Sequence, residues 1–198
     1  MHDRNNWGPS NVVQLDHDHK VKIKKRADCG PFLSMLCQHF DVGIWSPIES
    51  TLVEVVAKFL AAGIPSLKWS FLWGKETSGT KRNLNDLFSV IPVSLAPKAR
   101  CLQIDCDATA TAESPPSNVI TCPRWDLLEP NDDFLTRLIE PFQALSRNPS
   151  DIEYCTQYLV KDVIAAATPR IPVGPRLVHG GRKYKLSPNL LLLPPLCT

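Results

Sequence analysis

The clearest pattern of apolar and polar positions lies between Ser46 and Trp73. Apolar residues recur at spacings of three and four over 46–62, which predicts an amphipathic helix. Over 66–73 apolar and polar residues alternate instead, which predicts a strand with one more apolar face. The apolar stripe of the predicted helix consists of Ile48, Leu52, Val55, Val56, Phe59 and Leu60.

Local signals mark both ends of this predicted helix. Ser46 suits the N-cap, and Pro47 suits the first helical position because its missing N–H costs nothing there. Glu49 follows three residues after Ser46 and completes a capping box. Gly63 is expected to end the helix in a left-handed conformation. Residues 74–79 then read as a loop.

Two more amphipathic helices are predicted in the second half of the chain. One covers 132–145, with Asn131 as its cap and acidic residues in its first turn, where the helix dipole favours them. Pro141 interrupts this stripe and should kink or split the helix. The other covers 151–167 and should end before Pro169.

Shorter elements fill the region between these helices. Residues 85–93 indicate a short helix, and Leu102–Asp105 indicates a short strand. Residues 31–36 are apolar but too few for periodicity to distinguish a strand from a helical turn. The range 107–124 opens with small, polar and proline-containing residues and is expected to form a loop insert.

These elements predict an α/β or mixed α+β fold in which about three amphipathic helices pack on a small sheet. The length of 198 residues is typical of one domain, expected over 29–178. Residues 1–28 form a polar and basic N-terminal tail. Residues 179–198 form a tail rich in proline and leucine.

Composition narrows the classes of function. A net charge of +2 is too small for a whole-protein attraction to nucleic acid. Seven cysteines, an odd number without a C-x-x-C pair, indicate reduced thiols in the cytoplasm rather than a disulfide framework. The N-terminus has no apolar core of a secretory signal. Apolar runs such as Leu190–Leu193 are far shorter than the about 20 residues of a spanning helix.

The basic run Lys20–Arg26 has two readings. An edge strand whose lysines discourage pairing with other chains is favoured. Contact with nucleic acid or an anionic membrane, or a nuclear address, is the alternative, and the run contains no aromatic residues that would stack on bases.

Two groups of residues are of the types that bind metal ions, but their spacing does not suit a metal site. Residues 16–19 alternate aspartate and histidine, but adjacent side chains of an extended chain point to opposite sides, so an exposed tail is favoured. Cys29, Cys37 and His39 lack a fourth ligand and the pair spacing of a zinc site, so a buried segment is favoured.

No complete catalytic motif is present. The chain contains no G-x-G-x-x-G, no Walker-type loop, no G-x-S-x-G and no H-E-x-x-H sequence. The sequence therefore names no nucleophile, no acid–base pair and no metal centre, and no catalytic residue is assigned.

One family resemblance spans about half of the chain. Gly63 and Ile64 follow the helix, Gly74 follows the strand, and 169–174 reads Pro-Arg-Ile-Pro-Val-Gly. This order resembles the C-terminal half of the short-chain dehydrogenases/reductases. The resemblance implies an incomplete Rossmann-like fold, with NADP(H) as the implied cofactor and Gly74 as a cofactor-binding position.

The same resemblance implies altered chemistry. The catalytic tyrosine and lysine positions of that family fall on Asp41 and Trp45, and no glycine-rich cofactor loop precedes them. The resemblance thus implies a diverged or truncated oxidoreductase-like protein with residual NADP(H) binding and no ordinary catalysis. The alternatives are a non-enzymatic module that binds a protein partner, or an orphan, partly disordered chain with no evolved small-molecule site.

Overall fold

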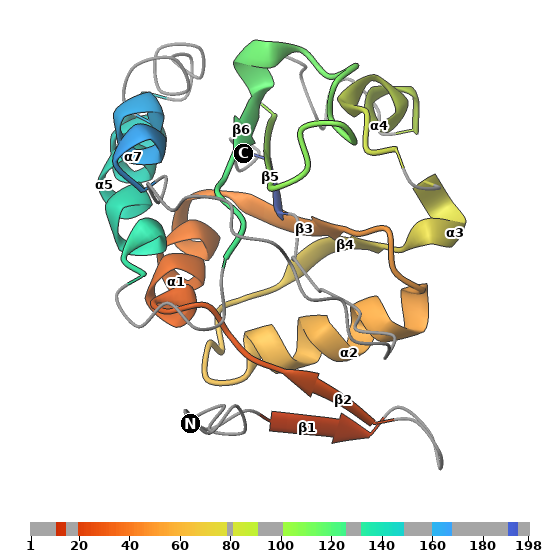
Figure 1. The fold of residues 1–198 in the computed structure, drawn as a ribbon. Helices are drawn as coiled ribbons and strands as arrows, with labels where there is room; N and C mark the ends of the chain where they lie inside the picture. Colours follow the sequence, from red (N-terminus) through yellow and green to blue (C-terminus); the bar gives the residue numbers. More distant parts are fainter. Residues whose placement is uncertain are drawn as a thin grey trace, which may run out of the picture.

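A computed structural model describes residues 11–14, 20–78, 81–90, 101–125, 132–148, 160–167 and 190–193. Helices pack around a central sheet, and a separate hairpin lies below α2 in the view of Figure 1. The helices are α1 (Cys29–His39), α2 (Ser50–Ala61), α3 (Lys75–Ser78), α4 (Leu84–Val90), α5 (Phe134–Arg147), α7 (Val160–Ala167) and the 3-10 turn η2 (Pro116–Asn118). The strands are β1 (Asn11–Gln14), β2 (Lys20–Ile23), β3 (Asp41–Trp45), β4 (Trp69–Trp73), β5 (Leu102–Asp105), β6 (Val119–Thr121) and β7 (Leu190–Leu193).

The central sheet is mixed, with the strand order β4-β3-β7-β5-β6. β3 pairs with β4 in parallel, and β5 pairs with β6 in parallel. β7 lies between these two pairs and is antiparallel to both β3 and β5. The four other strands therefore run in one direction, and their carboxyl ends share one edge. The prediction of a mixed α/β class is confirmed.

The middle strand comes from the segment predicted as a proline- and leucine-rich tail. Leu190 pairs with Ile44 on one side and with Ile104 on the other. Ile44 and Ile104 therefore lie at the same level of the sheet, two strand spacings or about 10 Å apart. This register fixes how far apart the residues that follow β3 and β5 can lie.

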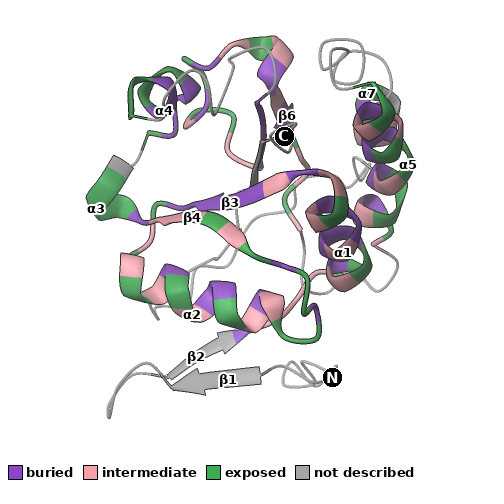
Figure 2. Cartoon of the chain, turned by 180° about the vertical axis from the view of Figure 1, so that it is seen from behind, coloured by how far each residue is buried: buried purple, intermediate pink, exposed green. Residues whose placement is uncertain are grey.

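Two hydrophobic clusters lie on opposite faces of the sheet. The larger one joins α1, α2 and α5 to the sheet, and Phe32 of α1 meets Phe142 of α5 edge to face at 5.7 Å between ring centres. β3 is buried along most of its length (Figure 2). The smaller cluster lies under α4 and consists of Trp45, Leu84, Leu87, Phe88 and Cys101.

The predicted helix and strand of 46–73 are both present, with shifted boundaries. α2 begins at Ser50, and its N-cap is Glu49, which makes no side-chain cap hydrogen bond. The prediction of Ser46 as N-cap is therefore wrong, because β3 and a short connection occupy the residues before Ser50. Gly63 has a φ of 88°, as predicted for a left-handed helix end. Residues 75–78, predicted as loop, form α3.

α1 and β3 resolve the region before α2. Residues 31–36 belong to an 11-residue helix rather than a strand. β3 follows it almost directly and had no counterpart among the predicted strands. Five residues with a glycine in the middle give too short a pattern for periodicity to detect.

The C-terminal helices match the predictions in part. α5 continues through Pro141 as one element, so the predicted split is wrong. Leu138, Phe142 and Leu145 are buried there, and this packing offsets the about 3 kcal/mol that an internal proline costs. Of the predicted helix 151–167, the described part is α7. Asn131 and the segment 169–174 lie outside the described residues.

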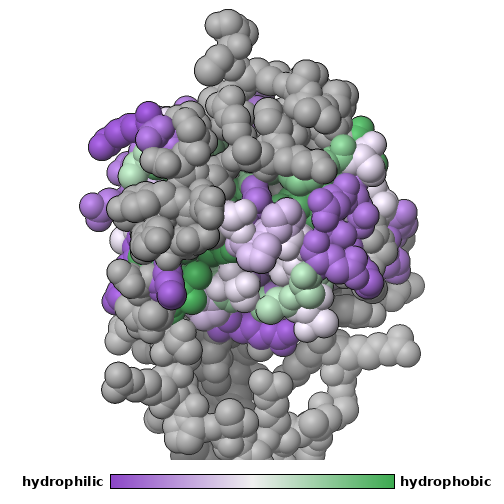
Figure 3. All heavy atoms as spheres, turned by 90° about the horizontal axis from the view of Figure 1, so that it is seen from above, coloured by the Kyte–Doolittle hydropathy of each residue, from purple (hydrophilic) through white to green (hydrophobic). Residues whose placement is uncertain are grey.

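The first four residues of the basic run, Lys20–Ile23, form a strand, as favoured, and this strand belongs to a hairpin. β2 pairs with β1 in an antiparallel two-stranded sheet, so part of the predicted N-terminal tail is also a strand. In the part of the chain that is described, none of the helices is long and apolar enough to cross a bilayer. Among the described residues, Val90 is the large hydrophobic side chain that stands exposed. The face seen in Figure 3 carries hydrophobic residues only in small separate areas where it is described.

Candidate functional site

The carboxyl edge of the parallel strands gathers polar residues. β3, β4, β5 and β6 end at Trp45, Trp73, Asp105 and Thr121. Open α/β sheets bind ligands in the crevice outside the carboxyl ends of their strands. A ligand-binding or catalytic site is therefore expected at this edge of the sheet.

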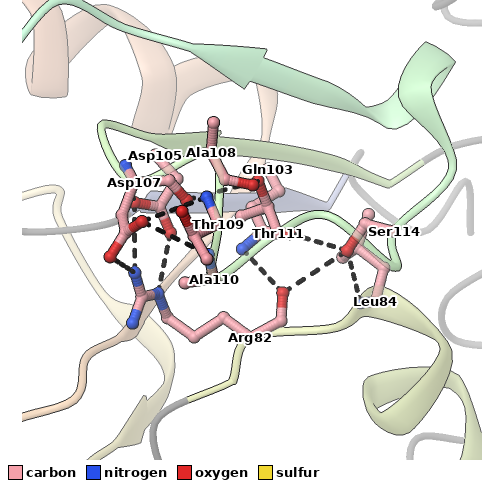
Figure 4. A network of polar contacts seen from close by, with 10 residues as sticks. All are labelled: Arg82, Leu84, Gln103, Asp105, Asp107, Ala108, Thr109, Ala110, Thr111 and Ser114. Carbon is pink, nitrogen blue, oxygen red and sulfur yellow. Dashed lines mark hydrogen bonds and ion pairs between the residues drawn. The ribbon is translucent and has the colours of Figure 1, made fainter.

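A buried ion pair lies at this edge, between the end of β5 and the segment before α4. Arg82 Nε donates to Asp105 Oδ2 at 2.7 Å, and Nη2 donates to Oδ1 at 3.3 Å, so the contact is bidentate (Figure 4). The side chains are only 3% and 1% exposed. Asp107 Oδ2 lies 4.0 Å from Arg82 Nη2, and its side chain is 41% exposed. The cluster thus has a closed side at Asp105 and an open side at Asp107.

The backbone of Arg82 is held by the segment that follows β5. Its N–H donates to the Ala110 carbonyl at 2.9 Å. Its carbonyl accepts from Gln103 Nε2 at 3.1 Å and from Ser114 Oγ at 3.4 Å. Buried Gln103 and Ser114 therefore fix the position of the guanidinium through the main chain, and not only through its charge.

Asp105 and Asp107 also shape the turn between β5 and η2. The Asp107 N–H donates to Asp105 Oδ1 at 2.8 Å. Asp107 Oδ1 accepts the N–H groups of Thr109 and Ala110 at 3.1 and 3.3 Å. These are Asx-type bonds, which satisfy turn N–H groups without a regular element. The loop predicted over 107–124 is present as a turn in its first part only, because η2 and the sheet strand β6 lie within the same range.

Ser46 lies at the same edge, one residue after β3. It is buried, and its N–H donates to the Trp73 carbonyl at 2.9 Å, which joins the ends of β3 and β4. Because Ile44 and Ile104 lie at one level of the sheet, Ser46 and Cys106 lie at one level too. Two strand spacings, about 10 Å, separate them.

The start of α2 is closed by Glu76 of α3. Glu76 Oε2 accepts from the Ser50 N–H at 3.0 Å and from Ser50 Oγ at 2.6 Å. These hydrogen bonds from Ser50 lower the pKa of Glu76, together with the Lys75 charge. A carboxylate at a helix N-terminus is favoured by the helix dipole. The anion position at the start of α2 is thus filled by the chain itself.

The charges of the cluster do not form a metal centre as they stand. Among the described residues, no group of three or more His, Cys, Asp or Glu side chains is arranged to hold a metal ion. Asp105 is engaged by Arg82, and one oxygen of Asp107 is engaged by the turn. The two carboxylates therefore do not fit a metal ion, and no step through one is derived.

Gly74, the predicted cofactor-binding residue, has a packing role. A Cβ at this position would lie 2.6–2.7 Å from the backbone N and Cα and the Oγ of Ser50, closer than any real contact. Glycine is therefore required where the end of β4 passes the start of α2.

Asp41 and Trp45 lie on a strand. The reductase resemblance would place them on the catalytic helix, but they are the first and last residues of β3. Burial raises the pKa of Asp41. Trp45 is buried in the smaller hydrophobic cluster.

The sequence interpretation missed Arg82, Asp107 and Ser114. The sequence did indicate the two aspartates, because Asp105 is the last residue of the predicted strand Leu102–Asp105 and Asp107 follows two residues later. Nothing in the sequence pairs them with Arg82, which is 23 residues away from Asp105.

The fold and the cluster define a class: an α/β protein with a carboxylate–guanidinium site at the carboxyl edge of its parallel strands. The model of the NLI interacting factor-like phosphatases matches residues 2–153. This match covers most of the chain, and the chain belongs to that family. Neither the curated proteins nor the solved structures that were compared with the chain gave a match.

This family membership overturns the reductase resemblance. The chain is not a short-chain dehydrogenase/reductase, and the oxidoreductase function with NADP(H) falls with it. The resemblance rested on a Gly-Ile pair after a helix and a glycine after a strand, features that many α/β proteins share. β3, which the family match covers, contradicts the alignment directly.

Proposed function

We propose that the chain binds a phosphate monoester at the carboxyl edge of its sheet and hydrolyses it, with a phosphorylated protein side chain as the substrate class. The proposal is supported by membership of a phosphatase family. The observation that carries it is the open side of the cluster, where the half-exposed Asp107 lies 4.0 Å from buried Arg82.

Phosphoryl transfer depends mainly on positioning and on electrostatic stabilisation of the charge on the transferred group. Arg82 supplies a positive charge in a buried setting, where an ionic interaction is stronger than in water. Asp105 balances this charge and holds the guanidinium in place. Nη2 of the same guanidinium lies 4.0 Å from Asp107 Oδ2, at the side of the cluster that solvent reaches.

Asp107 is the carboxylate of the cluster that solvent reaches. Its Oδ1 is fixed by two turn N–H groups, so its Oδ2 has a defined direction. We assign this oxygen to accept a hydrogen bond from the attacking water and so to orient it toward phosphorus. Such general-base assistance contributes about 10²–10⁴-fold to a rate.

The test measures phosphate release from p-nitrophenyl phosphate and from a phosphoserine peptide, with and without magnesium chloride. The substitution Asp107→Asn keeps an oxygen for the turn N–H groups and removes the charge. It should lower the rate about 100-fold or more while the circular dichroism spectrum stays the same.

The matched control is Glu113→Gln, an exposed carboxylate from the same segment that pairs with Lys81 at the surface. Its rate should equal that of the unmodified chain. The proposal is wrong if the unmodified chain releases no phosphate from either substrate, or if Asp107→Asn is as active as Glu113→Gln.

A further inference from the structure

Two cysteines directly follow the last paired residues of neighbouring strands. Asp105 of β5 pairs with Thr121 of β6, so Cys106 and Cys122 occupy the next level of the ladder. The Cys122 N–H donates to the Asp105 carbonyl at 2.8 Å, which continues the pairing to that level. The two residues are therefore side by side at the carboxyl edge.

Their side chains lie on the same face of the sheet. Ile104 pairs with Ile120, two residues before each cysteine, and both isoleucines belong to the larger hydrophobic cluster. Side chains two residues apart along a strand point the same way. Cys122 packs against that same cluster, as the alternation requires.

The spacing suits a covalent link. Neighbouring strands lie about 4.7–4.9 Å apart. A disulfide needs a Cα–Cα distance of about 4.4–6.8 Å. Both regular strands end one residue earlier, so the backbone at this level has room to adjust. Both sulfurs are free thiols in this structure.

Both thiols are half-buried at the edge of the sheet. Burial raises the pKa of Cys122 to about 12, and the neighbouring Cys106 is the second cause. The interaction with Cys106 in this shift places the two sulfurs close to each other. Cys106 lies at a bend and is half-buried, so an oxidant reaches it from the edge of the sheet.

We propose that Cys106 and Cys122 form a reversible disulfide when the chain meets hydrogen peroxide. The Cys106 sulfur attacks one peroxide oxygen and the O–O bond breaks, so the thiol becomes a sulfenic acid and its proton leaves with the other oxygen as water. The Cys122 thiol gives up its proton as it attacks the sulfenic sulfur, the S–O bond breaks, the hydroxyl leaves with that proton as a second water, and the S–S bond forms. Two thiols are oxidised and one hydrogen peroxide is reduced, and an external thiol reverses the change.

The pair lies beside the candidate site. Cys106 stands between Asp105 and Asp107, and a bond to Cys122 would draw its backbone toward β6. This movement changes the 4.0 Å separation between Asp107 and Arg82. An effect on hydrolysis rests on the proposed function, whereas formation of the disulfide does not.

The test uses the full chain carrying Cys155→Ser and Cys197→Ser, which removes the two thiols outside the described residues. The protein is treated with hydrogen peroxide, alkylated, and digested for mass spectrometry. No Lys or Arg lies between Cys106 and Cys122, but Glu113 does. Trypsin combined with a protease that cleaves after glutamate therefore separates the two cysteines unless they are linked.

A linked peptide that disappears on treatment with dithiothreitol is the expected result. Cys122→Ser should abolish the link and leave Cys106 as sulfinic acid, because no thiol resolves the sulfenic acid. Cys37→Ser, which changes a thiol that contacts Ser66 on another part of the fold, should leave the link intact. Over-oxidised but unlinked Cys106 in the starting protein, or a link from Cys106 to another cysteine, would overturn the proposal.

Phosphate release is measured on the same samples. If the proposed function holds, oxidation should lower the rate at least severalfold and dithiothreitol should restore it, and Cys122→Ser should not respond reversibly. If no phosphate is released before oxidation, the proposed function fails, and the peptide mapping still decides the disulfide. The two failures are therefore distinguishable.

Discussion

Lys81 and Arg82 are neighbours in the chain, and each pairs with an acid, but their surroundings are opposite. Lys81 Nζ lies 2.6 Å from Glu113, and those side chains are 70% and 57% exposed. Arg82 Nε lies 2.7 Å from Asp105, and those side chains are 3% and 1% exposed. Almost equal distances thus occur in two different media. The comparison separates the effect of burial from the effect of contact distance.

Burial changes what each pair does for the fold. In water the attraction between Lys81 and Glu113 is screened, and holding two long side chains in place opposes it. Arg82 and Asp105 have lost most of their hydration, so each needs the other and the hydrogen bonds around them. The exposed pair therefore contributes little to stability, whereas the buried pair joins β5 to the segment before α4.

The largest effect is expected from breaking the buried pair. Asp105→Asn leaves the Arg82 charge buried without its counter-ion, which costs about 3–5 kcal/mol of unfolding free energy. Urea denaturation followed by circular dichroism measures this loss. Glu113→Gln is the matched control and should leave the midpoint unchanged within error. Equal losses for the two variants would show that burial does not decide the strength of these pairs.

A smaller effect is expected when the buried pair is replaced as a unit. Arg82→Met with Asp105→Leu removes both charges together, so neither is stranded. The double variant should be more stable than the sum of the single losses predicts, with a coupling of about 0.5–3 kcal/mol. A double-mutant cycle in urea measures the coupling. Additive losses would mean that the two charges act independently.

The smallest effect concerns the exposed pair and its pH dependence. The hydrogen bond and charge of Lys81 lower the pKa of Glu113 from 4.5. A lowered pKa in the folded chain means that the contribution is present above pH 4.5 and is lost as the pH falls through the folded value. Lys81→Met should move the pKa of Glu113 back toward 4.5, read from its side-chain NMR shift. Adding salt should do the same in part, and a pKa that responds to neither change would rule out the Lys81 contact in solution.

The elements that could be predicted are those with a local signal. The helix stripe of 46–62 and the strand Leu102–Asp105 both appeared, and Gly63 ends its helix as expected. The predicted N-cap of this helix was wrong. Ser46 fits the cap pattern, but in the folded chain its N–H joins the ends of β3 and β4. A capping residue is recognised by its ability to form hydrogen bonds, and a serine can use that ability at a helix start or at a strand end.

The parts that escaped prediction depend on distant segments. β3 and β7 are short, and their identity as central strands comes from pairing with each other rather than from periodicity. The candidate site also depends on contacts between segments that are distant in the sequence. Arg82 and Asp105 each look like an ordinary surface charge in sequence, and only the fold brings them together and removes them from water.

The position of β7 has a consequence for the order in which the chain folds. Among the described strands it is made last, yet it supplies the backbone hydrogen bonds between β3 and β5. Synthesis proceeds at about 5–20 residues per second. Until β7 is made, the earlier strands of the central sheet can form only two separate parallel pairs, β3 with β4 and β5 with β6. The closing contact joins residues far apart in sequence, and such contacts slow folding because a long loop must first be closed. The two half-sheets thus expose unpaired strand edges to chaperones, or to other nascent chains, for seconds before the last segment arrives.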